Sequence, residues 1–345
     1  MKKISVLLAA VCLISSCYDD FTMDYDYTAA YITYQYDLRT FVYGEDNEVG
    51  FTVALGGVVD NDRDRKFNVS IENSLLSSDL SVFDETGEKG SFTAMDGMLG
   101  TAKLGSLSNA YVTNEMKAAG ITALTALPET HYAIDDLDAV KIRKGRHTQD
   151  ILLHPTAALF ADEKALKPCY ALGLLINTAD ADSLLRDRCF EIMAFKVENM
   201  FYGNWYHGGR VQIRSDKDGS LISEDYKSLE IPQTNNNVCA LKTTGLNTSV
   251  TDKLAHESGS LKLVFNEDMS IDVSDNSGER SISPILGQGS HFNGAKLLQD
   301  RVIYLSYSYS NNNGTSTYVT DTLKFRNRMR DGFNEWRSEN PEDYE

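Results

Sequence analysis

The sequence predicts an all-β protein, with a β-sandwich in the first half and an up-and-down β-barrel in the second. Eighteen tyrosines and six prolines are typical of a strand-rich chain. Apolar residues alternate with polar or small ones in many short stretches, which is the pattern of half-buried strands. The later strands follow one another as hairpins with no helix between them, which favours a meander that closes into a barrel.

The strands of the first half are recognised by apolar residues at every second position. Such series occur at residues 49–55, 67–71, 140–142, 151–153 and 170–176. Each series turns one apolar face toward a core, as the strands of a sandwich do. With 345 residues, the chain is long enough for two domains.

The domain limits follow from the places where alternation stops. It breaks between about 75 and 138, where "TNEMKAAG" (113–120) predicts a short helix in an insertion. The polar stretch "NTADADSLLRD" (177–187) has no alternation, so we place the boundary there. The expected domains are a sandwich at 26–180, a linker at 181–190, a barrel at 191–337 and an acidic tail at 338–345.

Two hairpins are predicted in the second half. The first is "LKLVFNEDMSIDV" (261–273), and the second is "IYLSYSYSNNNGTSTYVTDTLKF" (303–325), which turns at Asn313-Gly314. A two-residue turn there places Tyr309 opposite Tyr318, with Tyr307 and Arg326 on the same face. We expect the three tyrosines to line the barrel interior near an open end and to bind a glycan. The alternative is a stack that only stabilises the hairpin.

The N-terminus predicts export and lipid anchoring. Residues 1–16 combine two lysines, a short apolar run and small residues, as a secretory signal peptide does. Ile14 to Cys17 resembles the lipobox of bacterial lipoproteins, in which the cysteine is acylated. The acidic tether at 17–25 carries Asp19 and Asp20, which resemble the surface-export signal of Bacteroidetes lipoproteins. We expect a lipid-anchored protein of the outer membrane, exposed on the cell surface, with the periplasmic leaflet as the alternative.

Charge and cysteine spacing exclude several classes of partner. The net charge of −17 argues against binding to nucleic acid, which requires Lys and Arg to neutralise phosphates. The chain has no C-x-x-C pair and no histidine pair at ligand spacing, so neither a metal site nor a cofactor is expected. Cys169, Cys189 and Cys239 are expected to be buried, with a Cys169–Cys189 disulfide as the alternative.

Both halves resemble domains of known families. Through "VGFTVALGGVVDND", "LPETHYAI" and "VKIRKG…ILLHP…YALGLLI", the first half resembles the immunoglobulin-like N-terminal domain of Bacteroidetes polysaccharide-utilisation lipoproteins, which also precedes family-18 endoglycosidases. The second half resembles the uncharacterised domain that accompanies it, and its "FYGNWYHGG" is similar to the G-x-W opening of calycin and lipocalin-like barrels. This resemblance implies that Trp205 is a structural residue in contact with an arginine of the last strand, Arg326.

No motif predicts an enzyme. The D-x-x-D-x-D-x-E strand of family-18 glycosidases and the G-x-S-x-G nucleophile motif are both absent. Together with the resemblance, this predicts a surface lipoprotein of a glycan-utilisation system that binds carbohydrate without cleaving it, beside an outer-membrane importer. The alternative is a structural or complex-forming accessory lipoprotein that has no glycan ligand.

Overall fold

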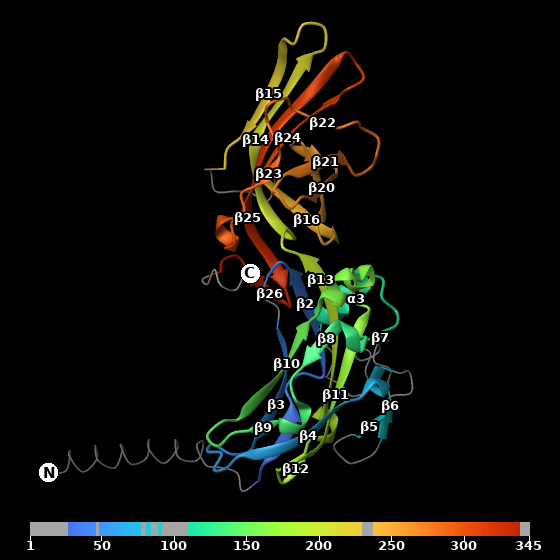
Figure 1. Ribbon diagram of the computed structural model, residues 1–345, viewed down its shortest axis with the longest axis vertical. Coiled ribbons are helices and arrows are strands. Elements are labelled where there is room, and N and C mark those ends of the chain that lie inside the picture. The colour runs from blue at the N-terminus through green and yellow to red at the C-terminus, as the bar shows by residue number, and fades with distance from the viewer. Residues whose placement is uncertain are drawn as a thin grey trace, which may run out of the picture. The chain divides into compact units, whose positions relative to one another are not determined.

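The computed structural model is all-β, as predicted, and consists of two compact units (Figure 1). It describes residues 27–45, 48–76, 81–83, 89–91, 110–229 and 237–338. Unit 1 comprises Met1–Leu38, Glu48–Thr156 and Cys169–Ala194, and unit 2 comprises Arg39–Asn47, Ala157–Pro168 and Phe195–Glu345. The signal peptide, Cys17, Asp19 and Asp20 lie outside the described residues.

The division between the units does not follow the predicted linker. Residues 181–190 belong to unit 1, where β12 (Ser183–Leu184) pairs in parallel with β1 (Ala29–Ile32). The polar residues of this stretch make hydrogen bonds within the unit, since the Asp182 carboxylate accepts from both the amide and the hydroxyl of Thr28 at 2.7 Å. This polar stretch is therefore part of the fold of unit 1.

Two main sheets make up unit 1, although residues 39–43 and 195–199 of the second sheet are counted with unit 2. The first has the order β12, β1, β3 (Val49–Gly56), β10 (Thr148–Pro155), β8 (Tyr132–Ile134). The second has the order β2 (Tyr36–Tyr43), β13 (Phe190–Asn199), β11 (Tyr170–Ala179), β4 (Arg65–Ile71), β9 (Lys141–Ile142), with β7 (Thr125–Ala126) also on β11. β5 (Ser81–Phe83) and β6 (Lys89–Ser91) form a separate pair.

The predicted strands and helix of unit 1 are confirmed. Alternation buries Phe51 and Val53 on β3 and Phe67 and Val69 on β4. The predicted helix is α3 (Ala110–Ala118), which packs two of its apolar side chains into the core. In the described part of the chain no helix is long and apolar enough to cross a membrane. The three cysteines in that part are unbridged, so the Cys169–Cys189 alternative is wrong.

Short helices complete the described secondary structure. Unit 1 has 3-10 helices at η1 (Asn73–Leu76), η3 (Glu129–His131), η4 (Leu137–Ala139) and η6 (Arg186–Arg188). Unit 2 has α4 (Ala157–Ala161), η5 (Glu163–Leu166) and η8 (Leu298–Asp300).

Unit 2 is built on one eleven-stranded sheet. Its path is β21 (Ile271–Asp275), β20 (Leu261–Phe265), β17 (Thr248–Thr251), β16 (Val238–Gly245), β14 (Gly203–Ser215), β25 (Thr315–Arg330), β24 (Val302–Ser310), β22 (Ser283–Pro284). β15 (Leu221–Lys227) pairs with β14, β23 (His291–Phe292) with β24, and β26 (Phe333–Glu335) with β25. β18 (Lys253–Leu254) and β19 (Glu257–Ser258) form a small hairpin that pairs with no described strand of this sheet.

The sheet curls into a nearly closed barrel, as the hairpin sequence predicts. Both predicted hairpins form, as β20–β21 and β24–β25. A single bridge between Ser270 and His291 joins the β21 edge to the β23 edge. The amide of Ile271 donates to the Ser290 carbonyl at 2.9 Å, and the amide of Phe292 donates to the Met269 carbonyl at 2.9 Å.

The contact predicted between Trp205 and Arg326 is wrong. Trp205 is fully buried, and its indole Nε1 donates to the Phe201 carbonyl at 3.0 Å. Its cross-strand neighbour is Phe325, whose ring lies edge-on at 5.4 Å. Arg326 falls at a β-bulge and lies over the Tyr206 ring at 5.8 Å. Because Phe325 points inward, alternation turns Arg326 outward. The bulge then shifts the alternation by one residue, so that Arg328 points inward.

Two buried arginines of unit 2, Arg301 and Arg328, bind the carboxylate of Glu45. Arg328 is 1% exposed and lies over the Tyr202 ring at 5.0 Å. Its guanidinium and that of Arg301 both donate to Glu45, at distances of 2.7–2.9 Å. Glu45 comes from the 39–47 segment, so this cluster ties that segment to the rest of unit 2.

Candidate functional site

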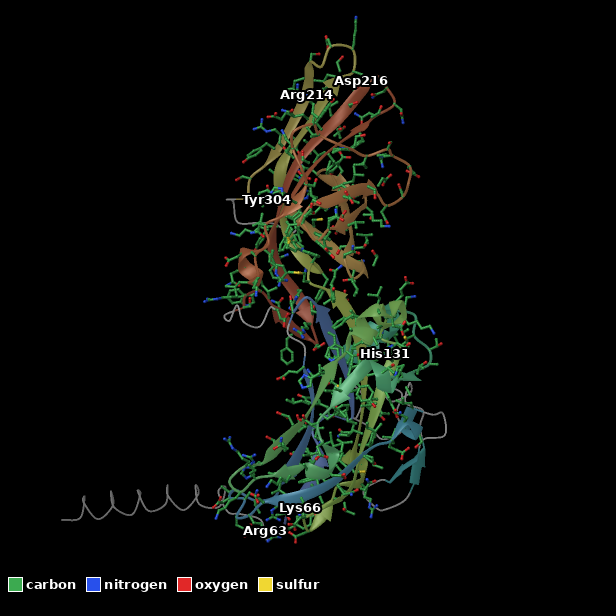
Figure 2. The ribbon with its side chains drawn as sticks, viewed as in Figure 1. Arg63, Lys66, His131, Arg214, Asp216 and Tyr304 are labelled. Carbon is green, nitrogen blue, oxygen red and sulfur yellow. The ribbon has the colours of Figure 1, made fainter. Side chains whose placement is uncertain are left out.

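A polar hollow of about 390 Å³ lies on the outer face of unit 2. It is formed where β15, β14 and β25 run side by side, near the turn between β14 and β15 (Figures 1 and 2). The residues that line it are Arg210, Gln212, Arg214, Gly219, Ile285, Gln288, Tyr318 and Thr320. We call this hollow the groove. Its lining combines an aromatic ring with amides and guanidinium groups, and it contains no carboxylate.

The strand register arranges these side chains in rows. Tyr318 on β25 is the cross-strand neighbour of Gln212 on β14, which in turn neighbours Glu224 on β15. In the next row, Arg210 lies over the exposed ring of Tyr226 at 5.9 Å. Two aromatic rings, on β25 and β15, therefore flank the polar side chains of β14.

The polar side chains of the groove are held by one another. The Gln212 amide donates to Glu224 at 2.5 Å and accepts from Arg214 at 2.8 Å. Arg210 donates to the same Glu224 oxygen at 3.2 Å. The Ser306 hydroxyl donates to Gln288 Oε1 at 3.2 Å, which leaves the Gln288 amide nitrogen as a donor. A ligand therefore meets side chains whose positions are already set.

The three predicted tyrosines do not share one face. β24 and β25 pair Ser308 with Tyr318 and Tyr309 with Thr317, one residue away from the predicted register. The turn is the cause, because Asn311 bonds to Thr315 around three residues, with positive φ at Asn312 (59°) and Gly314 (80°). A slip of one residue turns every side chain of a strand to the opposite face.

Tyr318 is the member of the predicted set that reaches the surface. It is 36% exposed and lies in the groove. Tyr307 is 1% exposed, and its hydroxyl accepts from the Ala255 amide at 2.7 Å. Tyr309 is half-buried and stacks beside Tyr307 at 6.5 Å, with the Arg280 guanidinium over its ring. Tyr307 and Tyr309 therefore pack in the barrel interior.

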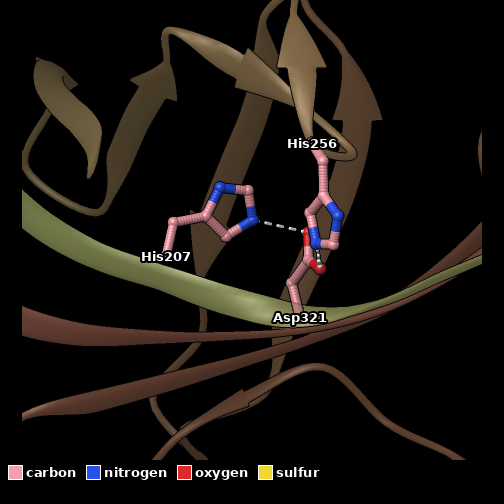
Figure 3. Close-up of side chains that lie close together, drawn as sticks. All are labelled: His207, His256 and Asp321. Carbon is pink, nitrogen blue, oxygen red and sulfur yellow. Dashed lines mark hydrogen bonds and ion pairs between the residues drawn. The ribbon is translucent and has the colours of Figure 1, made fainter. Parts of the chain in front are cut away.

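A buried polar cluster lies on the inner side of the same strands. His207 comes from β14, Asp321 from β25 and His256 from the tip of the β18–β19 hairpin, and each side chain is at most 5% exposed. Figure 3 shows both imidazole rings directed at the Asp321 carboxylate. His207 Nε2 lies 2.8 Å from Asp321 Oδ2, and His256 Nε2 lies 3.3 Å from Asp321 Oδ1. The far side of His256 contacts Asp225, with 2.6 Å between Nδ1 and Oδ2.

Two features of the backbone allow this cluster to form. Gly209 is the register partner of Asp321 and has φ of +140°, and an added Cβ would lie 2.3 Å from the Thr320 carbonyl oxygen. A glycine therefore lets β25 approach β14 closely at Asp321. The β18–β19 hairpin is fixed by a hydrogen bond from the Ala255 amide to the Tyr307 hydroxyl. This bond holds the adjacent His256 beside the Asp321 carboxylate.

The members of this cluster shift one another's pKa values. Burial raises the pKa of Asp321, but the two histidines outweigh burial and lower it below its ordinary value. Burial lowers the pKa of His256, but the carboxylates of Asp321 and Asp225 outweigh that effect and raise it. Burial also raises the pKa of the nearby Tyr307 hydroxyl, and the charge of Asp321 raises it further.

The sequence carried a signal for this cluster that spacing rules miss. On β14, His207 lies two residues after the buried Trp205, so both side chains point inward. On β25, Asp321 lies between the inward-pointing Val319 and Leu323. Charged residues in the apolar phase of a strand are rarely buried without a partner. The third member, His256, lies in a short turn that shows no such periodicity.

A second hollow, of about 300 Å³, lies in unit 1. Its lining includes Asp135, Asp136 and Asp150 beside Lys141 and Arg143, and it contains no aromatic ring. The three carboxylates accept hydrogen bonds from neighbouring backbone or side-chain groups, such as the Leu152 amide on Asp135 at 2.9 Å. These acids therefore serve the local fold.

Comparison with known proteins establishes the fold. No family model matches the chain, and no curated protein matches it. A Bacteroides ovatus structure of unknown function aligns with a TM-score of 0.62 at 20% identity, over 91% of this chain and 99% of that one.

Weaker likenesses are to other Bacteroides ovatus structures. A multidomain protein including DUF1735 has a TM-score of 0.39 at 10% identity, over 90% of this chain and all of that one. A candidate carbohydrate-binding protein has a TM-score of 0.28 at 11% identity, over 72% and 70%. Scores this low establish no shared fold, so the comparisons support a fold found in Bacteroides and leave function to the residues themselves.

Proposed function

We propose that this protein is a cell-surface lipoprotein that binds carbohydrate at the groove, as part of a glycan-utilisation system beside an outer-membrane importer. The observation that supports it best is Tyr318, a partly exposed ring beside amide and guanidinium donors in one hollow. A flat aromatic face packs against the apolar face of a sugar ring, and the donors bind its hydroxyls. Tyr226 adds a second exposed ring on the same strands.

We propose that binding occurs without cleavage. Glycoside hydrolysis uses two carboxyl groups on either side of the scissile bond. The residues that line the groove include none, and Glu224 at its border is engaged by Arg210 and Gln212. The alternative function, an accessory lipoprotein without a glycan ligand, makes the opposite prediction for the groove, since no sugar would then bind there.

The test is calorimetry of the Cys17→Ala chain against a panel of plant and host glycans. Tyr318→Ala should weaken binding roughly tenfold or more, equivalent to about 1.4 kcal/mol. Tyr304→Ala is the matched control, because Tyr304 is 40% exposed on β24 and stacks on His291 outside the groove (Figure 2).

Three outcomes would contradict the proposal. Absence of binding to every glycan would favour the accessory function. Equal losses in the Tyr318 and Tyr304 variants would exclude the groove as the binding site. Release of reducing sugar from a bound glycan would show that the protein is an enzyme.

A further inference from the structure

In the cluster of His207, His256 and Asp321, the hydrogen bonds in the described part of the chain leave two buried atoms unsatisfied, His256 Nε2 and Asp321 Oδ1. The 2.6 Å contact between His256 Nδ1 and the Asp225 carboxylate requires the imidazole proton to be on Nδ1. In the neutral ring, Nε2 then presents a lone pair to Asp321 Oδ1, only 3.3 Å away. Two lone pairs facing each other in a buried site repel, so a positive species must lie between them.

A proton on Nε2 would satisfy these atoms poorly. Both His256 Nε2 and Asp321 Oδ1 are buried, and neither has a hydrogen-bond partner within the described residues. Although the two atoms are close, they are not aligned for a hydrogen bond with each other. A cation that binds both atoms at once does not depend on that alignment.

The three side chains form a ligand set that suits a transition metal. Two imidazole nitrogens and one carboxylate are common ligands of zinc and of related divalent ions. One ligand atom from each side chain lies within 4.8 Å of the other two. His207 Nε2 is 2.8 Å from Asp321 Oδ2, and His256 Nε2 is 3.3 Å from the other carboxylate oxygen, Oδ1. Ligands at about 2.0–2.1 Å from a tetrahedral zinc ion lie about 3.3 Å apart, so small side-chain shifts complete the site.

Asp225 supplies the outer support that such sites use. A histidine that binds a metal through one nitrogen usually donates its other N–H to a carboxylate, which fixes the tautomer and the ring. His256 makes this contact with Asp225. The charges also balance, because one divalent cation neutralises Asp321 and Asp225 while both histidines stay neutral.

We propose that His207, His256 and Asp321 bind a divalent transition-metal ion of the zinc class inside the barrel, with Asp225 positioning His256. The ion would join β14, β25 and the β18–β19 hairpin at one point. Because it would bind the folded chain only, it would raise the stability of unit 2. This site is separate from the groove, and either proposal can fail alone.

The test uses the full Cys17→Ala chain without a histidine tag, freed of metal by a chelator and titrated with ZnCl₂. We expect one zinc ion per chain by calorimetry and by elemental analysis after dialysis. The unfolding midpoint should rise by roughly 5–10 °C when free zinc is a hundredfold above Kd. Cobalt(II) should give the visible absorption of a tetrahedral site.

Variants separate binding at this site from adventitious binding. Asp321→Asn and His256→Asn should each abolish the tight binding of one zinc ion per chain. Asp225→Asn should weaken zinc binding about 10–100-fold without unfolding the chain, because the Asp225 side chain is 60% exposed. His291→Asn is the matched control, since this exposed histidine stacks on Tyr304 and should leave zinc binding unchanged.

Two results would overturn the proposal. One is a wild-type chain that binds no zinc at 100-fold molar excess, which would mean that a protonated His256 holds the cluster as an ion pair. The other is an equal zinc affinity for the Asp225→Asn variant and the His291→Asn control.

Discussion

Arg328 donates two hydrogen bonds to Glu45, from Nη1 to Oε1 at 2.8 Å and from Nη2 to Oε2 at 2.7 Å. Arg301 donates to the same carboxylate at 2.9 Å, and all three side chains are at most 2% exposed. Glu45→Gln keeps the shape of the side chain but removes the counter-charge of the buried Arg301 and leaves Arg328 paired, among the described residues, with only the partly exposed Glu335. We expect it to lower the free energy of unfolding by about 3–5 kcal/mol, measured by urea denaturation. Glu224→Gln removes an exposed ion pair with Arg210 and should cost at most about 1 kcal/mol. Equal effects of the two substitutions would show that burial does not strengthen the Glu45 cluster.

The same carboxylate predicts acid sensitivity. Burial raises the pKa of Glu45, but Arg328 and Arg301 outweigh burial and lower it below its ordinary value. A lowered folded-state pKa stabilises the fold above the unfolded-state pKa, about 4.3, and this contribution is lost as pH falls through the folded-state value. The difference in unfolding free energy between wild type and Glu45→Gln should be full above about pH 5 and shrink below about pH 4. Denaturation curves at several pH values measure it, and a difference that does not change with pH would contradict the assignment.

Removing the hydroxyl of Tyr307 should loosen the β18–β19 hairpin. That hydroxyl accepts the Ala255 amide proton at 2.7 Å, and Ala255 is buried. Tyr307→Phe leaves the amide without an acceptor and should cost about 1–3 kcal/mol of unfolding free energy. Tyr318→Phe, on the outer face of β25, should change stability by less than about 0.5 kcal/mol. If both variants lose the same stability, the assignment of Tyr307 to the interior and Tyr318 to the surface is wrong.

Gly209 should tolerate no side chain. A Cβ there would lie 2.6 Å from the Asp321 Cα, at a φ of +140° that side-chain-bearing residues rarely adopt. Gly209→Ala should therefore cost about 2–4 kcal/mol, seen as a lower midpoint of thermal unfolding. Gly219→Ala is the control, because Gly219 also has positive φ but nothing lies within 4 Å of an added Cβ. Its cost should stay near about 1 kcal/mol, from the backbone alone.

The expected lipid anchor can be tested in cells. Cys17→Ala removes the predicted acylation site, so the protein should move from the membrane pellet to the soluble fraction. Replacing Asp19 and Asp20 should leave the protein in the pellet but protect it from external protease. A Cys17→Ala protein that still sediments with membranes would refute lipid anchoring at this residue.

Alternation predicted most strands because it follows directly from the two-residue period of a strand. The series at 49–55 and 170–176 became β3 and β11, and the hairpin at 261–273 became β20–β21. Register is harder, because it depends on turn geometry rather than on periodicity. A three-residue turn at 312–314 in place of a two-residue one moved Tyr318 from the inner face to the outer face.

Contacts between distant segments could not be predicted from local patterns. Glu45 meets Arg328 across 283 residues, and Asp182 meets Thr28 across 154. His207, His256 and Asp321 come from three different elements, so no short spacing rule contains them. The groove likewise joins β14 and β25 with the loop after β22.

The register of β14 against β25, which pairs Gly209 with Asp321, has a consequence for the time course of folding. A ribosome makes β14 first among the strands of this sheet and β25 near the end, with only the short β26 after it. Native pairings between sequence-distant strands give a high contact order, for which folding takes milliseconds to seconds. Until β25 has been synthesised, one edge of β14 exposes amide and carbonyl groups that can pair with another chain. Completion of unit 2 is therefore a late, slow event, and its nascent chain is the species most exposed to aggregation.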